Sequence, residues 1–106
     1  MTRPGPPYSL RQALTIFKRA FTEEGRVVIS HHCRQAMADP QDPFTIEDIL
    51  SVRAQGGITR PPERDPRTGE WTYRVVGPDQ KGDRLAVVFV PLGLHAIKLV
   101  TGFHTR

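Results

Sequence analysis

The chain has 106 residues, of which 38% are hydrophobic and 25% are charged, and a formal net charge of +4 at pH 7. This composition predicts one small globular domain and excludes disordered, collagen-like and disulfide-stapled classes. The longest apolar run, Leu85 to Val90, is far shorter than the ~20 residues of a membrane-spanning helix. No apolar stretch follows the first charged residue, so we expect no signal peptide, and the single cysteine fits a reducing cytoplasm.

The charges are unevenly distributed along the chain. Residues 1–34 carry six positive and two negative side chains, and residues 71–106 carry five positive and two negative ones. Residues 35–59 carry one positive and four negative side chains. The basic ends are compatible with a polyanionic partner such as RNA, although many small proteins have a similar balance.

Residues 1–8, with three prolines and a glycine, predict a disordered lead-in. A helix is expected to begin at Ser9, because Ser9 and Gln12 have the spacing of a capping box. Apolar residues then recur at three-and-four spacing as far as Phe21. Gly25 is expected to end this helix in the left-handed cap conformation.

The β-branched run 26–29 predicts an edge strand or an extended connector. Ser30 is placed to cap a second helix of about two turns, which the prolines of segment 39–43 end. Thr45 is placed to cap a third helix, with Ile46, Ile49 and Leu50 facing inward, and Gly56-Gly57 is expected to end it.

Segment 60–70 is rich in proline and charge and predicts a loop. The pattern then alternates, with Trp71, Tyr73 and Val75 on one face of a strand and Arg74 on the other. A turn over 77–83, a central strand over 85–90, a turn over 91–93 and a last strand over 94–103 complete the chain. We therefore expect a single α+β domain over 9–106, with helices packed on one face of a small, mainly antiparallel sheet.

Several short motifs occur in an order that resembles a bacterial family of small domains of unknown function. The family has a Ser/Thr-x-His-Ala-x-x-Arg-Met helix, a second helix with a Glu-Asp pair, and a Trp/Tyr-x-Tyr-x-Val-x-Gly strand. The matching residues here are Ser30, His32, Met37, Ile46 to Ile49, Gly57-Ile58, Trp71 to Gly77 and Leu99 to Thr101. Two positions depart from the pattern: Cys33 replaces the alanine, and Ala36 replaces the arginine.

This family resembles the RelE, BrnT and MqsR toxins, small ribonucleases of toxin–antitoxin systems. The resemblance implies a RelE-like fold, RNA cleavage without a metal or other cofactor, and a cognate antitoxin protein as partner. Because Ala36 removes an arginine, the alternative is a non-catalytic module of the same fold that binds a protein or nucleic acid. The sequence leaves the oligomeric state open.

Metal-free RNA cleavage needs a base, an acid and cations around the phosphate. His32 is the first candidate for proton transfer, because it lies in the first turn of a helix; its alternative role is packing between helix and sheet. His104 is a further candidate if the last strand presents it to the site, and is otherwise part of a frayed tail. Tyr73 is a candidate proton donor or base-stacking group, or a core aromatic.

Arginine and lysine supply the cations that the phosphate requires. Arg74 and Lys98 are candidates within the catalytic site, and Arg34 and Arg60 are candidates for substrate binding. Each has the alternative of a solvated surface charge. No metal site is expected, because His31, His32 and Cys33 diverge around a helix and no second ligand pair has the required spacing.

Overall fold

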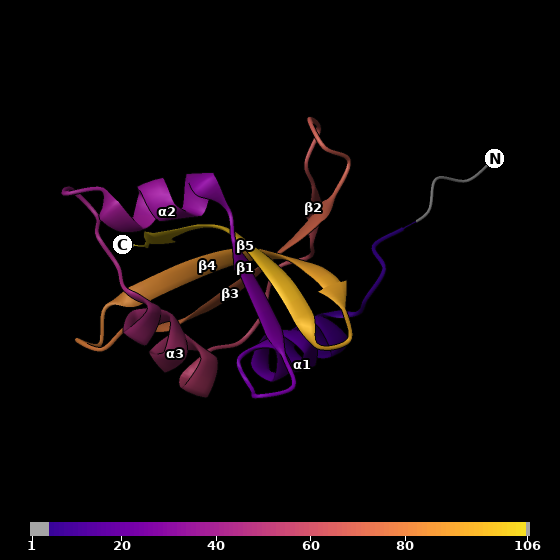
Figure 1. The fold of residues 1–106 in the computed structure, drawn as a ribbon, viewed down its shortest axis with the longest axis horizontal. Coiled ribbons are helices and arrows are strands. Elements are labelled where there is room, and N and C mark those ends of the chain that lie inside the picture. Colours follow the sequence, from indigo (N-terminus) through magenta and orange to yellow (C-terminus); the bar gives the residue numbers. More distant parts are fainter. Residues whose placement is uncertain (1–4, 106) are drawn as a thin grey trace.

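The computed structural model describes residues 5–105, which form three helices and five strands (Figure 1). Their order along the chain is α1 (Leu10–Ala20), β1 (Arg26–Ile29), α2 (His31–Ala38), α3 (Ile46–Gln55), β2 (Glu63–Arg64), β3 (Trp71–Pro78), β4 (Arg84–Gly93) and β5 (Ala96–His104). This confirms the expected α+β class. No helix within residues 5–105 is long and apolar enough to cross a membrane.

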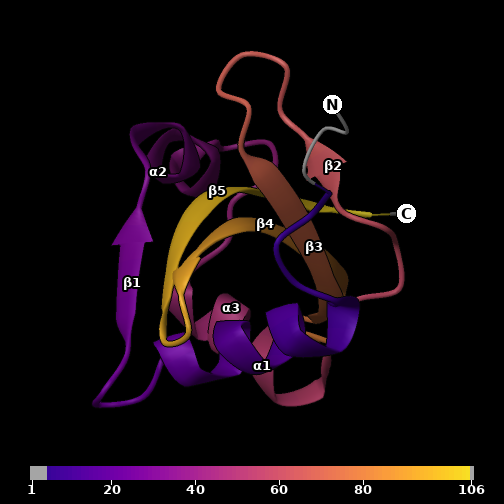
Figure 2. The same cartoon turned by 90° about the vertical axis from the view of Figure 1, so that its right-hand side faces the viewer.

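The five strands form one sheet in the order β1-β5-β4-β3-β2. β1 pairs in parallel with β5, and the other neighbouring strands are antiparallel. β1 therefore lies at an edge, as its β-branched sequence predicts. The sheet arches over α1 and α3 in Figure 2, whereas α2 follows β1 and lies against β5.

The main core lies between the arched sheet and the helices α1 and α3. Alternate residues of β3 and β4, among them Tyr73, Val75, Val87 and Phe89, point into this core and are buried. Phe17 of α1 contacts the ring of Phe89, with 5.0 Å between the ring centroids. The alternation predicted for β3 is confirmed, so its remaining side chains project from the opposite face of the sheet.

All three predicted helix starts are confirmed by their caps. Ser9 and Gln12 form a capping box at α1, and Thr45 and Asp48 form another at α3. The Ser30 hydroxyl accepts a hydrogen bond from the Cys33 amide at the start of α2. These contacts are local in sequence, which is why spacing alone could place them.

Several details of the predicted elements are wrong. Helix α1 ends at Ala20, and Gly25 has no positive φ; a side chain there would meet the carbonyl oxygen of Arg19 at 2.2 Å. On α3, Leu50 is exposed and Val52 is buried instead. Two residues of the predicted loop, Glu63 and Arg64, form the short strand β2. Strand β4 extends through the predicted turn to Gly93.

The predicted lead-in falls partly outside the described residues, which begin at Gly5. Tyr8, its last residue, is fixed by Tyr73: the Tyr73 hydroxyl donates to the Tyr8 carbonyl oxygen at 2.5 Å and accepts from the Tyr8 amide at 3.1 Å. The chain is therefore held against the sheet one residue before the α1 cap.

Candidate nucleic-acid interface

The face of the sheet opposite α1 and α3 carries a mixture of arginine, threonine and apolar side chains. On this outer face Arg74 of β3 pairs in register with Val88 of β4. Strand registers also align Val76 with Ala86, and Ala86 with Phe103 of β5. Paired residues of neighbouring strands project from the same face, so these side chains form one continuous surface.

A groove runs along the outer face of β3, beside the segment that connects α3 to β2. Its central hollow has a volume of about 330 Å³, and its lining residues are Thr59, Arg60, Arg74, Val76, Arg84 and Thr105. A hollow of about 320 Å³ adjoins it through Thr59, Val76 and Arg84, and one of about 60 Å³ adjoins it through Arg60 and Arg74. We call these three hollows together the arginine groove. From Thr72 to Pro78 it follows about 20 Å of strand.

Three arginines from different elements meet at the central hollow. Arg60 precedes β2, Arg74 lies on β3, and Arg84 begins β4. Within residues 5–105, none of these three guanidinium groups forms an ion pair or a side-chain hydrogen bond. Arg74 lies over the ring of Phe103, 5.0 Å from its centroid. The groove therefore offers free planar donors of the kind that bind phosphate oxygens in pairs.

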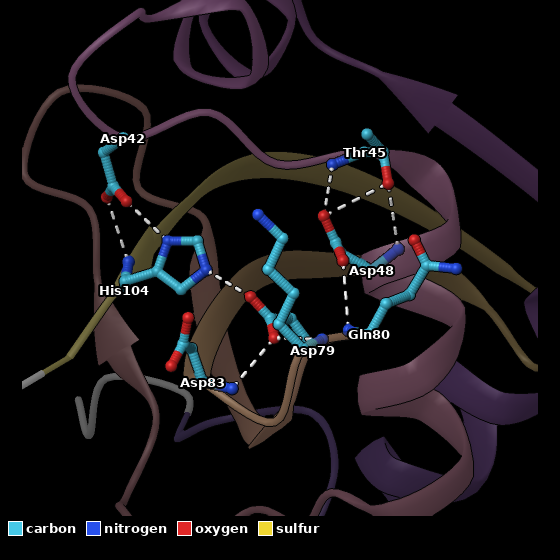
Figure 3. Close-up of polar contacts among 8 residues, drawn as sticks. Asp42, Thr45, Asp48, Asp79, Gln80, Asp83 and His104 are labelled. Carbon is cyan, nitrogen blue, oxygen red and sulfur yellow. Dashed lines mark hydrogen bonds and ion pairs between the residues drawn. The ribbon is translucent and has the colours of Figure 1, made fainter.

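A second cluster lies at the end of the sheet, where His104 is held between two aspartates (Figure 3). His104 Nδ1 is 2.5 Å from Asp42 Oδ1, and His104 Nε2 is 2.8 Å from Asp79 Oδ2. The amide of His104 also donates to Asp42 Oδ2 at 3.0 Å. We call this arrangement the histidine clamp. It joins the α2–α3 loop, the β3–β4 turn and the last strand.

The charges of the clamp stabilise one another. Burial lowers the pKa of His104, but hydrogen bonds to Asp79 and Asp42 and their negative charges outweigh burial and raise that pKa above its usual value. Burial raises the pKa of Asp79, but hydrogen bonds from His104 and from the amides of Asp83 and Lys81 outweigh it and lower that pKa. The clamp thus favours the protonated form of His104 and the ionised form of Asp79.

This bonding leaves His104 poorly placed for catalysis. Both ring nitrogens already face carboxylates, so neither is free to exchange a proton with a substrate. The adjoining cavity of about 440 Å³ is also lined by Asp48 and Asp83, which disfavour an approaching phosphate. The alternative of a frayed tail is wrong, because His104 is the last residue of β5.

The other predicted site residues do not line the central hollow. His32 and Arg34 are exposed on α2, which contacts β5. Tyr73 is 1% exposed within the core, and its hydroxyl is bonded to Tyr8. Lys98 forms an ion pair with Glu70 at 2.8 Å.

Of the predicted residues, the structure brings Arg60 and Arg74 into the central hollow, and Arg60, Tyr73 and Arg74 into the adjoining hollow of about 60 Å³. Arg84 and Thr105 line both that hollow and the cavity beside His104. The sequence analysis missed Arg84 and Phe103. The registers Pro78 with Arg84 and Ala86 with Phe103 place them on the outer face, and a correct hairpin alignment was the signal that could have found them.

No protein-family model, curated protein or solved structure matches this chain. The groove and the clamp are therefore interpreted from their own geometry. Within the described residues, no group of three or more histidine, cysteine, aspartate or glutamate side chains is arranged to hold a metal ion.

Proposed function

We propose that this protein is a non-catalytic RNA-binding module that holds RNA phosphates in the arginine groove. The observation that carries the proposal is the meeting of Arg60, Arg74 and Arg84 at one hollow, where none of them forms an ion pair with an acidic residue among residues 5–105. Free arginines on a surface repel one another, and a phosphate chain relieves that repulsion while accepting paired hydrogen bonds.

The lining of the central hollow favours binding over cleavage. Its side chains are arginine, threonine and valine, none of which readily transfers a proton near neutral pH. The histidines named as proton-transfer candidates lie elsewhere: His32 is on α2, and His104 is bonded at both nitrogens. The central hollow thus supplies cations for a phosphate, and none of its lining side chains is suited to activate the ribose hydroxyl. Glu63 lines only the adjoining hollow of about 60 Å³.

Two features favour RNA among the possible polyanions. The motif order resembles a family related to ribonuclease toxins, which implies contact with RNA. The exposed Thr59 also lines the hollow, and its hydroxyl is suited to contact a ribose 2′-hydroxyl or a phosphate. A cytoplasmic location, inferred from the single cysteine, belongs to the same proposal.

Fluorescence anisotropy with a labelled RNA oligonucleotide tests the proposal. Arg74→Gln and Arg84→Gln are each expected to weaken binding about ten-fold, since a hydrogen bond to a charged group contributes about 1.5 kcal/mol. Arg11→Gln is the matched control, because Arg11 is an exposed arginine on α1, across the sheet from the groove. Equal losses in all three variants, or no binding by the wild type, would overturn the proposal.

The same RNA is then examined by gel electrophoresis after incubation with the protein in EDTA. We expect intact RNA. Cleavage that disappears in Arg74→Gln would instead support the metal-independent ribonuclease, together with a cognate antitoxin as its partner.

A further inference from the structure

The outer face of the sheet has an apolar strip between its arginines. The strip consists of Val76, Ala86 and Phe103, which the registers of β3, β4 and β5 align in one row. Arg74 lies one row away on one side, and Arg84 lies one row away on the other. Rows on the same face of a sheet are about 7 Å apart. The apolar strip therefore lies between Arg74 and Arg84, one on each side.

This strip is not part of the core between the sheet and the helices. Ala86, at the centre of the strip, is fully buried, so the accessible part of the strip consists of Val76 and Phe103, which are half-buried on the face opposite α1 and α3. Arg74 lies over the Phe103 ring, 5.0 Å from its centroid. A ligand that consisted only of phosphates would gain nothing from an apolar floor. A ligand with both phosphates and flat aromatic rings would use the floor and the arginines together.

We propose that the ligand is single-stranded RNA and that one unpaired base stacks against Phe103 and Arg74, while neighbouring phosphates contact Arg60 and Arg84. The inference rests on the proposed RNA binding and adds the class of RNA. A duplex keeps its bases stacked inside and presents its backbone and groove edges, so it gains little from the apolar strip. A single strand can turn one base onto it.

The variant Phe103→Leu tests this inference, because leucine keeps an apolar side chain and removes the ring. Stacking of one base on an aromatic side chain contributes about 1–3 kcal/mol, so binding of single-stranded RNA is expected to weaken by about five- to 150-fold. Phe103→Tyr, which keeps the ring, is expected to bind within about two-fold of the wild type. Circular dichroism and thermal melting establish that both variants are folded.

Two further ligands separate stacking from charge. Inorganic polyphosphate carries phosphates without bases, and its affinity is expected to be the same for the wild type and Phe103→Leu. Duplex RNA of equal length is expected to bind the wild type at least ten-fold more weakly than the single strand. A 2-aminopurine base in the single strand is expected to change fluorescence on binding to the wild type, and less on binding to Phe103→Leu.

The outcomes distinguish this inference from the proposed function. If the wild type binds neither RNA nor polyphosphate, both fail. If it binds single-stranded RNA, duplex RNA and polyphosphate equally, and Phe103→Leu changes none of them, the groove binds phosphate chains and stacking is overturned. If Phe103→Leu weakens the binding of single-stranded RNA and of polyphosphate to the same degree, the ring acts only by positioning Arg74, and stacking is again overturned.

Discussion

His104 is the residue that fixes the C-terminal end of the fold. Its ring contacts Asp42 and Asp79, which lie 62 and 25 residues away in the sequence. The His104 side chain is 21% exposed and that of Asp79 is 6% exposed, so their attraction is only partly screened by water. A charged hydrogen-bond pair in this setting stabilises the folded state by joining segments that no local contact connects.

The clamp predicts a pH-dependent stability. The pKa of His104 is raised in the folded state. The contribution of His104 to folding stability is therefore complete below the usual histidine pKa of about 6.5, and it is lost as the pH rises through the pKa of the folded state. The pKa of Asp79 is lowered from its usual value of 3.8. The contribution of Asp79 to folding stability is therefore present above about pH 3.8, and it is lost as the pH falls through the pKa of the folded state. The clamp therefore stabilises the fold most between about pH 4 and 6.5.

We predict that His104→Gln lowers the free energy of unfolding by about 2 kcal/mol at pH 5.5, and by clearly less at pH 8.5. Urea unfolding at the two pH values measures this difference. His95→Gln is the control, since His95 is exposed in the β4–β5 turn. The same loss at both pH values would show that the imidazolium charge does not contribute.

At the scale of elements, α3 is joined to β3 by a close approach of two backbones. A side chain at Gly77 would lie 2.7 Å from the Cα atom of Gly56, and the neighbouring Gly57 and Val76 exchange backbone hydrogen bonds at 3.0 and 2.9 Å. The end of α3 therefore needs a glycine opposite it on β3. This contact also positions the segment that forms one wall of the arginine groove.

Gly77→Ala is expected to destabilise the protein by about 2 kcal/mol, because the added methyl group forces the two backbones apart. Thermal or urea unfolding measures the change. Gly57→Ala provides the comparison: no atom lies within 4 Å of its added carbon and its φ is not positive, so we expect little change or a small stabilisation. Equal effects of the two substitutions would contradict the close-approach explanation.

Helix α2 carries His32, which the resemblance placed at the catalytic site. The helix contacts β5, but none of the lining residues of the three groove hollows belongs to α2. We predict that His32→Ala changes RNA affinity by less than two-fold, as measured by anisotropy beside Arg74→Gln. A ten-fold loss in His32→Ala would place RNA on α2 and contradict the groove as the binding surface.

How much the sequence predicted depends on the distance over which each contact acts. The caps at Ser9, Ser30 and Thr45 involve residues three positions apart, so spacing was sufficient to find them. The face of Arg74 followed from the alternation of β3. In contrast, β2 is a two-residue strand that exists only through its pairing with β3, and its composition is that of a loop.

The candidate site was harder to predict because it depends on registers between strands. Arg84 reaches the arginine groove because β4 pairs with β3 from Arg84 opposite Pro78, and no local pattern marks that alignment. The histidine clamp likewise unites three distant segments. The sequence supplied residue types that bind phosphate, and the fold determined which of them meet.

At the scale of the whole molecule, the fold separates charges that alternate along the sequence. Asp42 and Asp48 from the acidic middle join Asp79 and Asp83 around the clamp cavity. Arg60 and Arg74 line the groove, and Arg84 borders both sites. Lys81 also lines the clamp cavity and Glu63 lines one end of the groove, but carboxylates outnumber cationic side chains in the first and arginines predominate in the second. An approaching polyanion is therefore favoured along β3 over the end of the sheet.

This separation predicts how RNA binding depends on salt. Each phosphate neutralised on a single strand contributes about −0.7 to the slope of log K against log salt concentration. Two groove arginines, Arg60 and Arg84, that each neutralise one phosphate therefore predict a slope of about −1.4, measured by anisotropy from low to moderate salt. Arg84→Gln is expected to make the slope shallower by about 0.7, whereas Arg11→Gln leaves it unchanged. A slope twice as steep would require basic side chains outside the groove to contact the RNA. A slope near zero would contradict phosphate binding by these arginines.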